Sequence, residues 1–289
     1  MTRLSLCLSL WALFAFACDP AAADASSGEL SWAVESNGST VANLFGTLHT
    51  RSLDNARTFH PKALATFDKS TVLYVETDLS AIDVARFSER ALLSSAAAGL
   101  DTQLTPAEWE QLSLATRDLI EIDVLRRVRP WYAVQLYLRA TVPSLLETDV
   151  KPMDLALIDA ARARGAEVRF LEPWEEQVFA VSITTDVAQL KASLALGATE
   201  LERAQRDLEA EWERGDASAL DARIGALNAE QQRFLFRERN ERWVSVIQAA
   251  ISNGDRSIFV AVGAGHLVGG AKGLPGLLRA GRLTVSRRP

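Results

Sequence analysis

Cysteine is almost absent from this chain. Among 289 residues only Cys7 and Cys18 are cysteines, so no disulfide framework and no cysteine metal site can form after position 18. An excess of positive charge is also missing. The net charge of -6 and the pI of about 5.3 argue against a nucleic-acid partner, because nucleic-acid-binding surfaces are basic. Hydrophobic residues make up 48% of the chain, which is enough for a sizeable core without disulfides.

The amino-terminal residues have the pattern of an export signal. A positive residue precedes an apolar run over 4–17, which is too short to span a membrane as a mature helix. Small residues allow cleavage after Ala17 or near Ala23, and we take 1–23 as the predicted signal peptide. Cleavage after Ala17 would leave Cys18 as a lipid-anchored amino terminus. We therefore expect a protein of the bacterial periplasm or cell envelope, which contacts the membrane only through its signal or this lipid.

Residues 24–289 are predicted to form a single domain in which strands and helices alternate. The strands are expected at 30–34, 40–45, 71–76, 168–171, 257–262 and 283–285, and an Asn-Gly turn joins the first two. Helix-forming sequence dominates from about 80 to 250. This order predicts an α/β fold with a mixed, mostly parallel central sheet and a large helical insertion. The stretch 201–214 is charged nearly all round, so we expect a solvent-exposed helix there.

The chain contains only three histidines, and two of them have the same local context. Residues 44–49 and 260–266 each consist of an apolar strand that leads into Gly-x-x-His, with His49 and His266 as the last residues. Glycine lets the backbone turn tightly or approach a ligand closely. In open α/β sheets, ligands bind at the carboxyl ends of the strands. The third histidine, His60, precedes a proline at a helix start, and we expect it on the surface.

A carboxylate follows a third strand, at Glu76. Three strand ends would then present His49, His266 and Glu76 to one crevice, a set that suits a divalent metal with open positions for water and substrate. The opposing interpretation is that each histidine is an ordinary loop or structural residue, since no local ligand spacing connects two positions at opposite ends of the chain. From the residues alone, both interpretations stay open.

Longer blocks of the sequence resemble the TraB/GumN family. The opening block runs from Asn43 to His49 and then from His60 to Asp78, and the closing block runs from Phe259 to Gly269 and on to Leu278. Four shorter blocks lie between them, at Pro130-Trp131, Met153-Asp154, Leu171-Glu172 with Glu176-Gln177, and Glu238-Arg239-Asn240 with Trp243. The resemblance covers about residues 30–287. It implies a fold related to the erythromycin esterases and to haem-binding lipoproteins of the ChaN type.

The family includes the animal Tiki proteins, which are metal-dependent proteases that rely on two Gly-x-x-His motifs and a glutamate. Carried onto this chain, the resemblance implies that His49, His266 and Glu76 bind a divalent metal such as Mn, Co or Zn, and that Glu76 is also catalytic. Arg239 and Asn240 would face the same crevice from the last long helix. There Arg239 would hold a carboxylate or polarise an oxyanion, and Asn240 would orient water or a carbonyl.

The sequence therefore favours a metal-dependent hydrolase, in the first place a peptidase, acting on a peptide or another small substrate in the cell envelope. The alternative is a non-catalytic envelope protein that binds a peptide, haem or metal. A metal-free hydrolase with His49 as general base is a third possibility. Glu172 is a weaker candidate for the same crevice. Arg51, close after the first motif, would disfavour a cation or bind an anionic group of the substrate.

Overall fold

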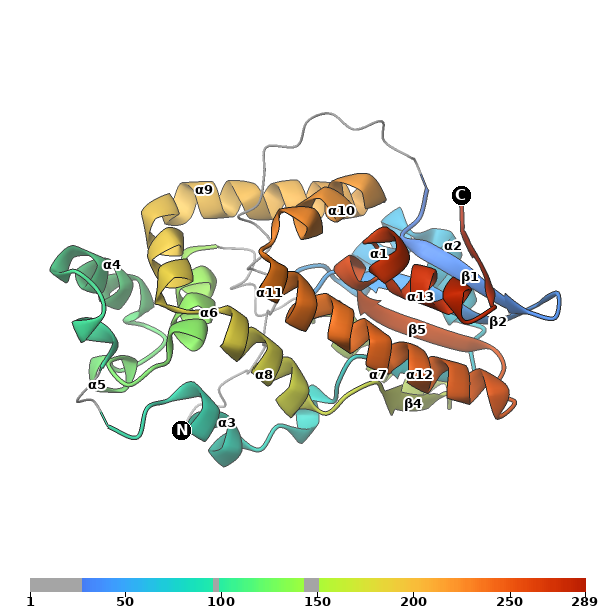
Figure 1. Cartoon of the computed structure of the whole chain (residues 1–289), viewed down its shortest axis with the longest axis horizontal. Helices are drawn as coiled ribbons and strands as arrows, with labels where there is room; N and C mark the ends of the chain where they lie inside the picture. The colour runs from blue at the N-terminus through green and yellow to red at the C-terminus, as the bar shows by residue number, and fades with distance from the viewer. Residues whose placement is uncertain (1–27, 96–98, 143–150) are drawn as a thin grey trace. The chain divides into compact units, whose positions relative to one another are not determined.

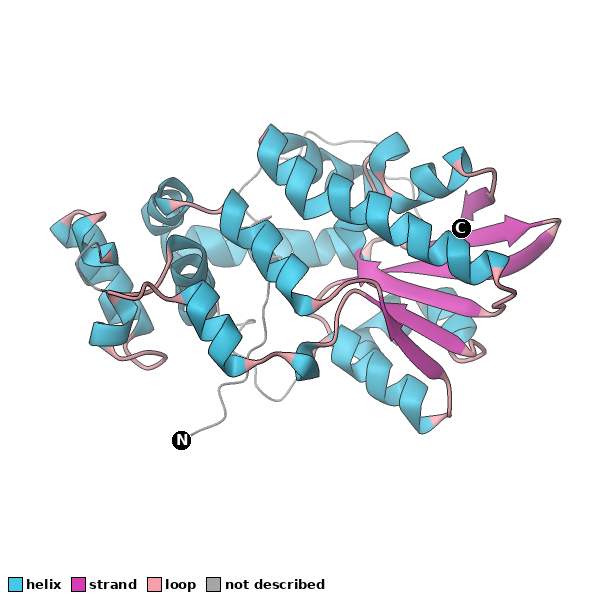
Figure 2. Cartoon of the chain, turned by 60° about the horizontal axis from the view of Figure 1, so that its bottom comes forward, coloured by secondary structure: helices cyan, strands magenta, loops and turns pink. Residues whose placement is uncertain are grey.

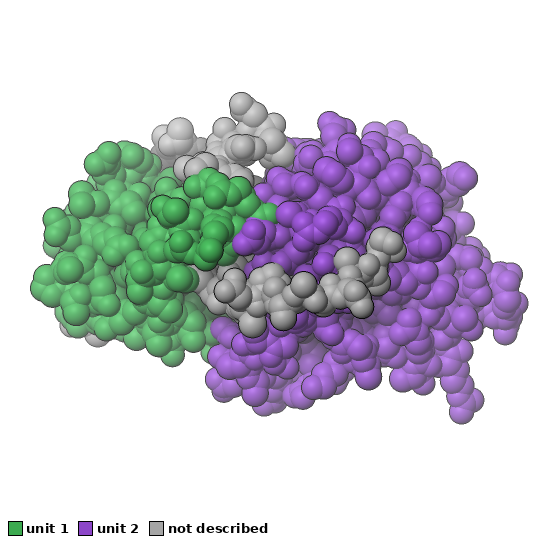
Figure 3. All heavy atoms as spheres, turned by 90° about the horizontal axis from the view of Figure 1, so that it is seen from above, with its two compact units in different colours: residues 1–16, 79–148, 174–206 green, residues 17–78, 149–173, 207–289 purple. Residues whose placement is uncertain are grey.

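The computed structural model describes residues 28–95, 99–142 and 151–289, and it divides the chain into two compact units (Figure 3). The sheet unit consists of the described residues within 17–78, 149–173 and 207–289. The helical unit consists of those within 79–148 and 174–206. The chain thus leaves the sheet unit after β3 and again after β4, and each departure supplies helices to the other unit (Figure 1).

A six-stranded sheet forms the centre of the sheet unit. Its strands are β1 (Ser31–Ser36), β2 (Ser39–Thr47), β3 (Val72–Val75), β4 (Glu167–Phe170), β5 (Ile258–Gly263) and β6 (Thr284–Arg287). They lie in the order β4-β3-β5-β2-β1-β6. The four neighbours β4, β3, β5 and β2 are parallel, whereas β1 pairs antiparallel with both β2 and β6. The prediction of a mixed, mostly parallel sheet is confirmed.

The first two strands form the expected hairpin. Asn37 (φ 52°) and Gly38 (φ 76°) occupy the turn, and Ser36 pairs with Ser39 across it. Two successive residues with positive φ are typical of the type I′ turn, whose twist matches that of the flanking strands. The Asn-Gly pair is therefore a local signal that was sufficient to predict this part of the fold.

Helices cover both faces of the sheet (Figure 2). The helical segments of the sheet unit are α1 (Leu53–Phe59), α2 (Pro61–Phe67), α7 (Met153–Ala163), the end of α9 (Val187–Glu213), α10 (Ala217–Ala226), α11 (Ala229–Gln231), the π-helical segment η6 (Gln232–Arg237), α12 (Glu238–Ser252), η7 (Ala264–His266), η8 (Gly270–Lys272) and α13 (Leu274–Ala280). Helix α7 packs on β3 and β4, and α2 packs on β2. Helix α7 ends before Gly165, whose φ of 77° is typical of the glycine that follows the end of a helix.

The helical unit contains η2 (Leu79–Ala81), α3 (Val84–Ala91), η4 (Leu100–Thr102), α4 (Pro106–Thr116), α5 (Ile122–Leu125), α6 (Pro130–Thr141), α8 (Trp174–Thr184) and the first part of α9 (Val187–Glu213). Proline occupies the first turn of α4 and α6, where no backbone hydrogen bond is lost. Among the described residues, no helix is both long and apolar enough to cross a membrane.

The prediction that 201–214 is a solvent-exposed helix is wrong. Within the sheet unit, the end of α9 buries Leu208 and Trp212, which are four residues apart and therefore share one face of the helix. Some charged side chains on this stretch are buried as well. Glu211 is one of them, and its carboxylate accepts two hydrogen bonds from Arg223, at 2.6 and 2.8 Å. The apolar face of this helix is narrow, so the high content of charged residues hides it in the sequence.

The prediction that His60 lies on the surface is also wrong. His60 joins α1 to α2 and is 0% exposed. Its Nε2 donates to the carbonyl of Trp212 at 3.0 Å, and its ring lies 4.4 Å from the Trp212 ring. Burial lowers the pKa of His60 to about 4, so the ring is neutral near pH 7. Pro61 does begin a helix, but His60 turns inward at that junction.

Candidate functional site at the carboxyl edge of the sheet

Four neighbouring parallel strands end at the same edge of the sheet, and each is followed by an ionisable residue. Glu76 follows β3, Glu172 follows β4, His49 follows β2, and His266 ends η7 directly after β5. The register places Thr47 of β2 opposite Gly263 of β5, so the two Gly-x-x-His motifs leave the sheet side by side. The structure therefore brings together the three strand ends that the sequence singled out, and beside them the end of β4, where Glu172 was the weaker candidate.

The glycines of the two motifs act through close approach. A Cβ atom at Gly46 would lie 3.0 Å from both the Cα and the Cβ of Ala264, so only glycine fits there without displacing the neighbouring motif. In the second motif, the backbone N–H of Gly263 donates to Oε1 of Glu76 at 2.7 Å. The motifs thus hold their own strand ends together and fix the carboxylate between them.

Arg239, near the start of α12, is the centre of a buried charged network. Its Nε and Nη2 donate to Glu172 at 2.9 and 2.5 Å, and Nη2 also donates to Glu76 at 2.8 Å. Nη1 donates to the Leu235 carbonyl at 3.2 Å, and the guanidinium lies 4.6 Å from the Trp243 ring centre. All of these charged side chains are buried, and a buried charge is tolerated when it is paired and hydrogen-bonded in this way.

The network shifts the two glutamates in opposite directions. Burial raises the pKa of Glu76, but Arg239, together with His266 and His49, outweighs burial and holds that pKa below its ordinary value. At Glu172, burial prevails and raises the pKa, although Arg239 opposes it. Glu76 is therefore an ionised carboxylate near pH 7. Sequence reasoning ranked Glu172 below Arg239 and Asn240, whereas the structure makes it the main partner of Arg239.

His266 is held in one tautomer. Asn240 donates from Nδ2 to the carbonyls of His266 and Lys272, at 3.4 and 3.1 Å, so its Oδ1 is the acceptor for Nδ1–H of His266 at 2.6 Å. The Nε2 of His266 then accepts from Nη1 of Arg239 at 3.2 Å. Burial and the charge of Arg239 lower the pKa of His266 to about 3. The imidazole is therefore neutral over the whole physiological range.

His49 has a partner that sequence reasoning did not assign. Its Nδ1 is hydrogen-bonded to a carboxylate oxygen of Asp154, in the first turn of α7. Burial lowers the pKa of His49, but Asp154 outweighs burial and raises it overall, and His49 in turn lowers the pKa of Asp154. A signal for Asp154 existed, because it shares the buried stripe of α7 with Leu157, Ile158 and Ala161.

Arg51 pairs with carboxylates of the chain itself, whereas the sequence suggested an anionic group of the substrate. Its guanidinium forms ion pairs with Glu209 at 3.2 Å and with Glu213 at 2.5 Å, both on the end of α9. These contacts fix the loop that follows His49. They also neutralise a positive charge that would otherwise lie close to the first motif.

A model of the TraB/PrgY/gumN family matches residues 30–287 of this chain. The chain belongs to the TraB/PrgY/gumN family. A search of curated proteins and a search of solved structures each found no match. In this family member, the residues that carry the resemblance at the two ends of the match, His49, Glu76 and His266, lie at one edge of the sheet.

In the structure, two of the predicted metal ligands, Glu76 and His266, are engaged by other groups of the protein. No group of three histidine, cysteine or acidic side chains in the described part of the chain is arranged to hold a metal ion. Glu76 accepts from Gly263 and Arg239, and both nitrogens of His266 are engaged by Asn240 and Arg239. A metal bound by these residues would have to displace Arg239. The divalent metal stays a prediction, and we assign no chemical step to it.

A cavity of about 360 Å³ borders this network within the sheet unit. Its wall includes Asn240 and Phe236, and the Phe236 ring lies 5.0 Å from that of His266. Arg237 and Lys272 also line the cavity, against the single carboxylate of Asp221. Its charge therefore favours an anionic group, such as a carboxylate, next to the residues that hold His266.

Proposed function

We propose that this protein is a hydrolase, in the first place a peptidase of the cell envelope, in which His49 is the general base and Asp154 orients its ring. The observation that carries the proposal is the hydrogen bond between His49 Nδ1 and the buried Asp154 carboxylate, beside the Glu76–Arg239 network. A histidine held through one nitrogen by a carboxylate presents the other nitrogen in the tautomer that can accept a proton.

The environment of His49 suits this role better than that of His266. The side chain of His49 is 13% exposed, although its Nε2 atom is itself buried, so a substrate or water molecule would have to enter the site to reach that nitrogen. Its pKa lies above the ordinary value of 6.5, which is where a general base that works near neutral pH is effective. His266 is 1% exposed and has a pKa of about 3, so it is a poor base.

In the proposed reaction, His49 takes a proton from a water molecule as the water oxygen bonds to the carbonyl carbon of the substrate. The protonated imidazole, stabilised by Asp154, then gives that proton to the leaving nitrogen as the C–N bond breaks. The products are a carboxylic acid and an amine, which near pH 7 are present as a carboxylate and an ammonium group. Arg239, Glu76 and Glu172 keep the strand ends in register while the charge on His49 changes.

One experiment separates this proposal from its alternatives. The protein is purified without a histidine tag, its metal content is measured, and a peptide library is incubated with it in the presence and absence of a chelator. Cleavage that persists with the chelator and disappears in His49→Ala supports the metal-free general base. Chelator-sensitive cleavage together with bound metal instead supports the metal-dependent hydrolase, and it would overturn the assignment of His49 as the sole activator of water.

A non-catalytic binding protein is the second candidate, and a specific observation favours it. Arg239 already donates to two carboxylates, a carbonyl and an imidazole of the protein itself, which is typical of a structural network. This candidate predicts retention of a peptide, haem or metal with no turnover. Cleavage of any peptide that depends on His49 would contradict it.

A further inference from the structure

Exposed apolar side chains are concentrated in the helical unit. Seven of the nine large hydrophobic side chains that are exposed among the described residues belong to it: Val84, Leu114, Ile122, Val124, Phe179, Ile183 and Leu196. Isolated exposed hydrophobic residues need no explanation, whereas those that line one groove together indicate a binding surface. Two of the seven, Val84 and Val124, line the same cavity.

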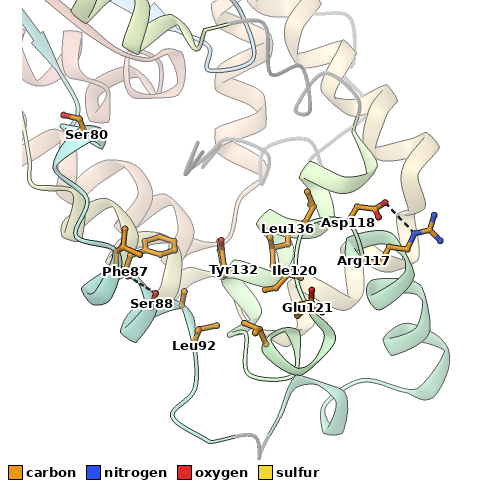
Figure 4. Close-up of a pocket in the computed structure, with 14 residues that line it drawn as sticks. Ser80, Phe87, Ser88, Leu92, Arg117, Asp118, Ile120, Glu121, Tyr132 and Leu136 are labelled. Carbon is orange, nitrogen blue, oxygen red and sulfur yellow. Dashed lines mark hydrogen bonds and ion pairs between the residues drawn. The ribbon is translucent and has the colours of Figure 1, made fainter. Parts of the chain in front are cut away.

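This cavity has a volume of about 1200 Å³ and lies wholly within the helical unit. Its lining comes from three stretches, within 80–92, 117–124 and 132–136. Figure 4 shows the side chains extending from Ser80 at one end to the Arg117–Asp118 pair at the other. Because Val84 is 65% exposed, the cavity is open to solvent on that side. It is an elongated groove and not an enclosed pocket.

The wall of the groove is pre-formed. The Phe87 ring meets the Tyr132 ring edge to face at 5.4 Å and the Trp131 ring at 5.8 Å. Backbone hydrogen bonds tie the end of α3 to the segment before α6, from Leu93 N–H to the Arg127 carbonyl at 2.7 Å and from Arg129 N–H to the Ala91 carbonyl at 2.8 Å. A rigid aromatic wall lowers the entropic cost of binding, since little has to be ordered.

The lining of the groove has more negative than positive side chains. Arg117 lies 3.6 Å from Asp118 and pairs with it, while Glu121 adds a second carboxylate to the lining. The lining therefore carries one more negative than positive charge. An anionic ligand, such as a fatty acid or an acidic lipid headgroup, is disfavoured, and a cationic group next to an apolar one is favoured.

We propose that this groove binds a peptide segment with two or three apolar side chains next to a lysine or arginine. The volume exceeds the usual range of small-molecule pockets, about 300–1000 Å³, and the elongated shape suits successive side chains of one chain. The choice of a peptide rests on the proposed peptidase function. Binding itself does not require the catalytic step.

The test measures binding of fluorescent peptides to the His49→Ala protein by anisotropy, so that no peptide is consumed. Three peptides are compared: one with apolar residues and a lysine, one with glutamate in place of that lysine, and one with serine in place of the apolar residues. The first is expected to bind at least about tenfold more tightly than the third, because apolar burial supplies most of the affinity. It should bind about two- to fivefold more tightly than the second.

Substitutions then locate the binding. Val124→Ser and Val84→Ser should each weaken binding of the first peptide by about tenfold, since both side chains line the groove. Leu114→Ser is the matched control, because Leu114 is 56% exposed in the same unit but does not line the groove. Glu121→Gln should remove the preference for lysine over glutamate. All of these side chains are exposed, so the fold should persist, and circular dichroism checks that it does.

Equal binding of the three peptides, or an effect of Leu114→Ser as large as that of Val124→Ser, would overturn the proposal. So would binding of dodecyl maltoside micelles or anionic lipid vesicles in place of every peptide. If His49-dependent hydrolysis is found but the three peptides bind equally or not at all, the groove proposal fails while the hydrolase stands. If peptides bind as expected and no hydrolysis is found, the reverse holds.

Discussion

His49 and His266 follow the same Gly-x-x-His pattern at the ends of neighbouring strands, but their surroundings are opposite. His49 is hydrogen-bonded to a carboxylate, and its pKa is raised. His266 lies between Asn240 and the guanidinium of Arg239, and its pKa is lowered to about 3. The motif fixes where each imidazole leaves the sheet, whereas the partner decides whether the ring can carry a proton. We therefore assign different tasks to two residues that look equivalent in the sequence.

The largest expected effect is the loss of catalytic activity when His49, the proposed base, is replaced. His49→Ala should lower kcat/KM for a cleaved peptide by about a thousandfold, because a positioned general base contributes roughly 10²–10⁴. Circular dichroism checks that this variant folds, because His49 is the partner of the Asp154 carboxylate. His60→Ala serves as a histidine control outside the site, and its specific activity is measured on the folded fraction. Retention of more than a tenth of the activity in His49→Ala would exclude this residue as the base.

The second effect is a loss of stability when the charged network beside His266 is broken. Arg239→Met should lower the free energy of unfolding by about 3–5 kcal/mol, because it leaves Glu76 and Glu172 buried without their positive partner. Arg237→Met, on an exposed side chain two residues earlier, should change it by less than about 0.5 kcal/mol. Urea denaturation gives both values. Equal values for the two variants would mean that the network does not stabilise the fold.

The third effect is a change in the pH dependence of catalysis, which the pKa of His49 should set. Asp154 raises the pKa of His49, and the base must be neutral, so kcat/KM should rise with pH through a midpoint above 6.5. In Asp154→Asn the midpoint should move down, because the carboxylate that opposes burial is removed, and the rate at the optimum should fall as the ring loses its orientation.

Asp159→Asn, an exposed position on the same helix α7, provides the matched control for the Asp154 variant and should leave the midpoint unchanged. A midpoint that moves up in Asp154→Asn, or one that stays fixed, would show that the titrating group is not His49. Because the readout is a midpoint as well as a rate, a merely destabilised variant would not produce the expected result.

The sequence predicts the strand ends of this site well and their partners poorly, for a physical reason. The β2, β3 and β5 strands are apolar runs with local boundaries, and the glycine of each motif marks its end, so convergence of His49, Glu76 and His266 followed from the parallel sheet alone. The choice of partner depends on packing between distant segments. Asp154 reaches His49 only because α7 packs on β3 and β4.

The wrong predictions have the same origin. His60 is buried because Trp212, far away in the sequence, accepts its hydrogen bond and packs against its ring. The end of α9 is buried because Leu208 and Trp212 form a stripe too narrow to dominate the composition of a charged helix. In each case the local pattern was typical of a surface, and tertiary packing decided otherwise.

The smallest expected effect is on the pH dependence of stability. His266 and His49 should change the stability in opposite directions as the pH rises. The pKa of His266 is about 3 in the folded protein and near 6.5 in the unfolded chain, so only the unfolded chain takes up this proton between those values. Stability should therefore fall as the pH falls from about 6.5 towards 3, by about 1.4 kcal/mol per pH unit for this residue. His60, with a pKa of about 4, acts in the same direction.

His49 acts in the opposite direction. Its folded pKa is raised, so its contribution is fully present below about 6.5 and is lost as the pH rises through the folded value. Urea denaturation of His266→Gln between pH 4 and 6 should show a shallower loss of stability in acid than the parent chain, even if the variant is less stable at pH 7. His49→Gln should keep the acid slope and lose the alkaline one. Identical slopes in the two variants would contradict the assignment of opposite environments to the two motifs.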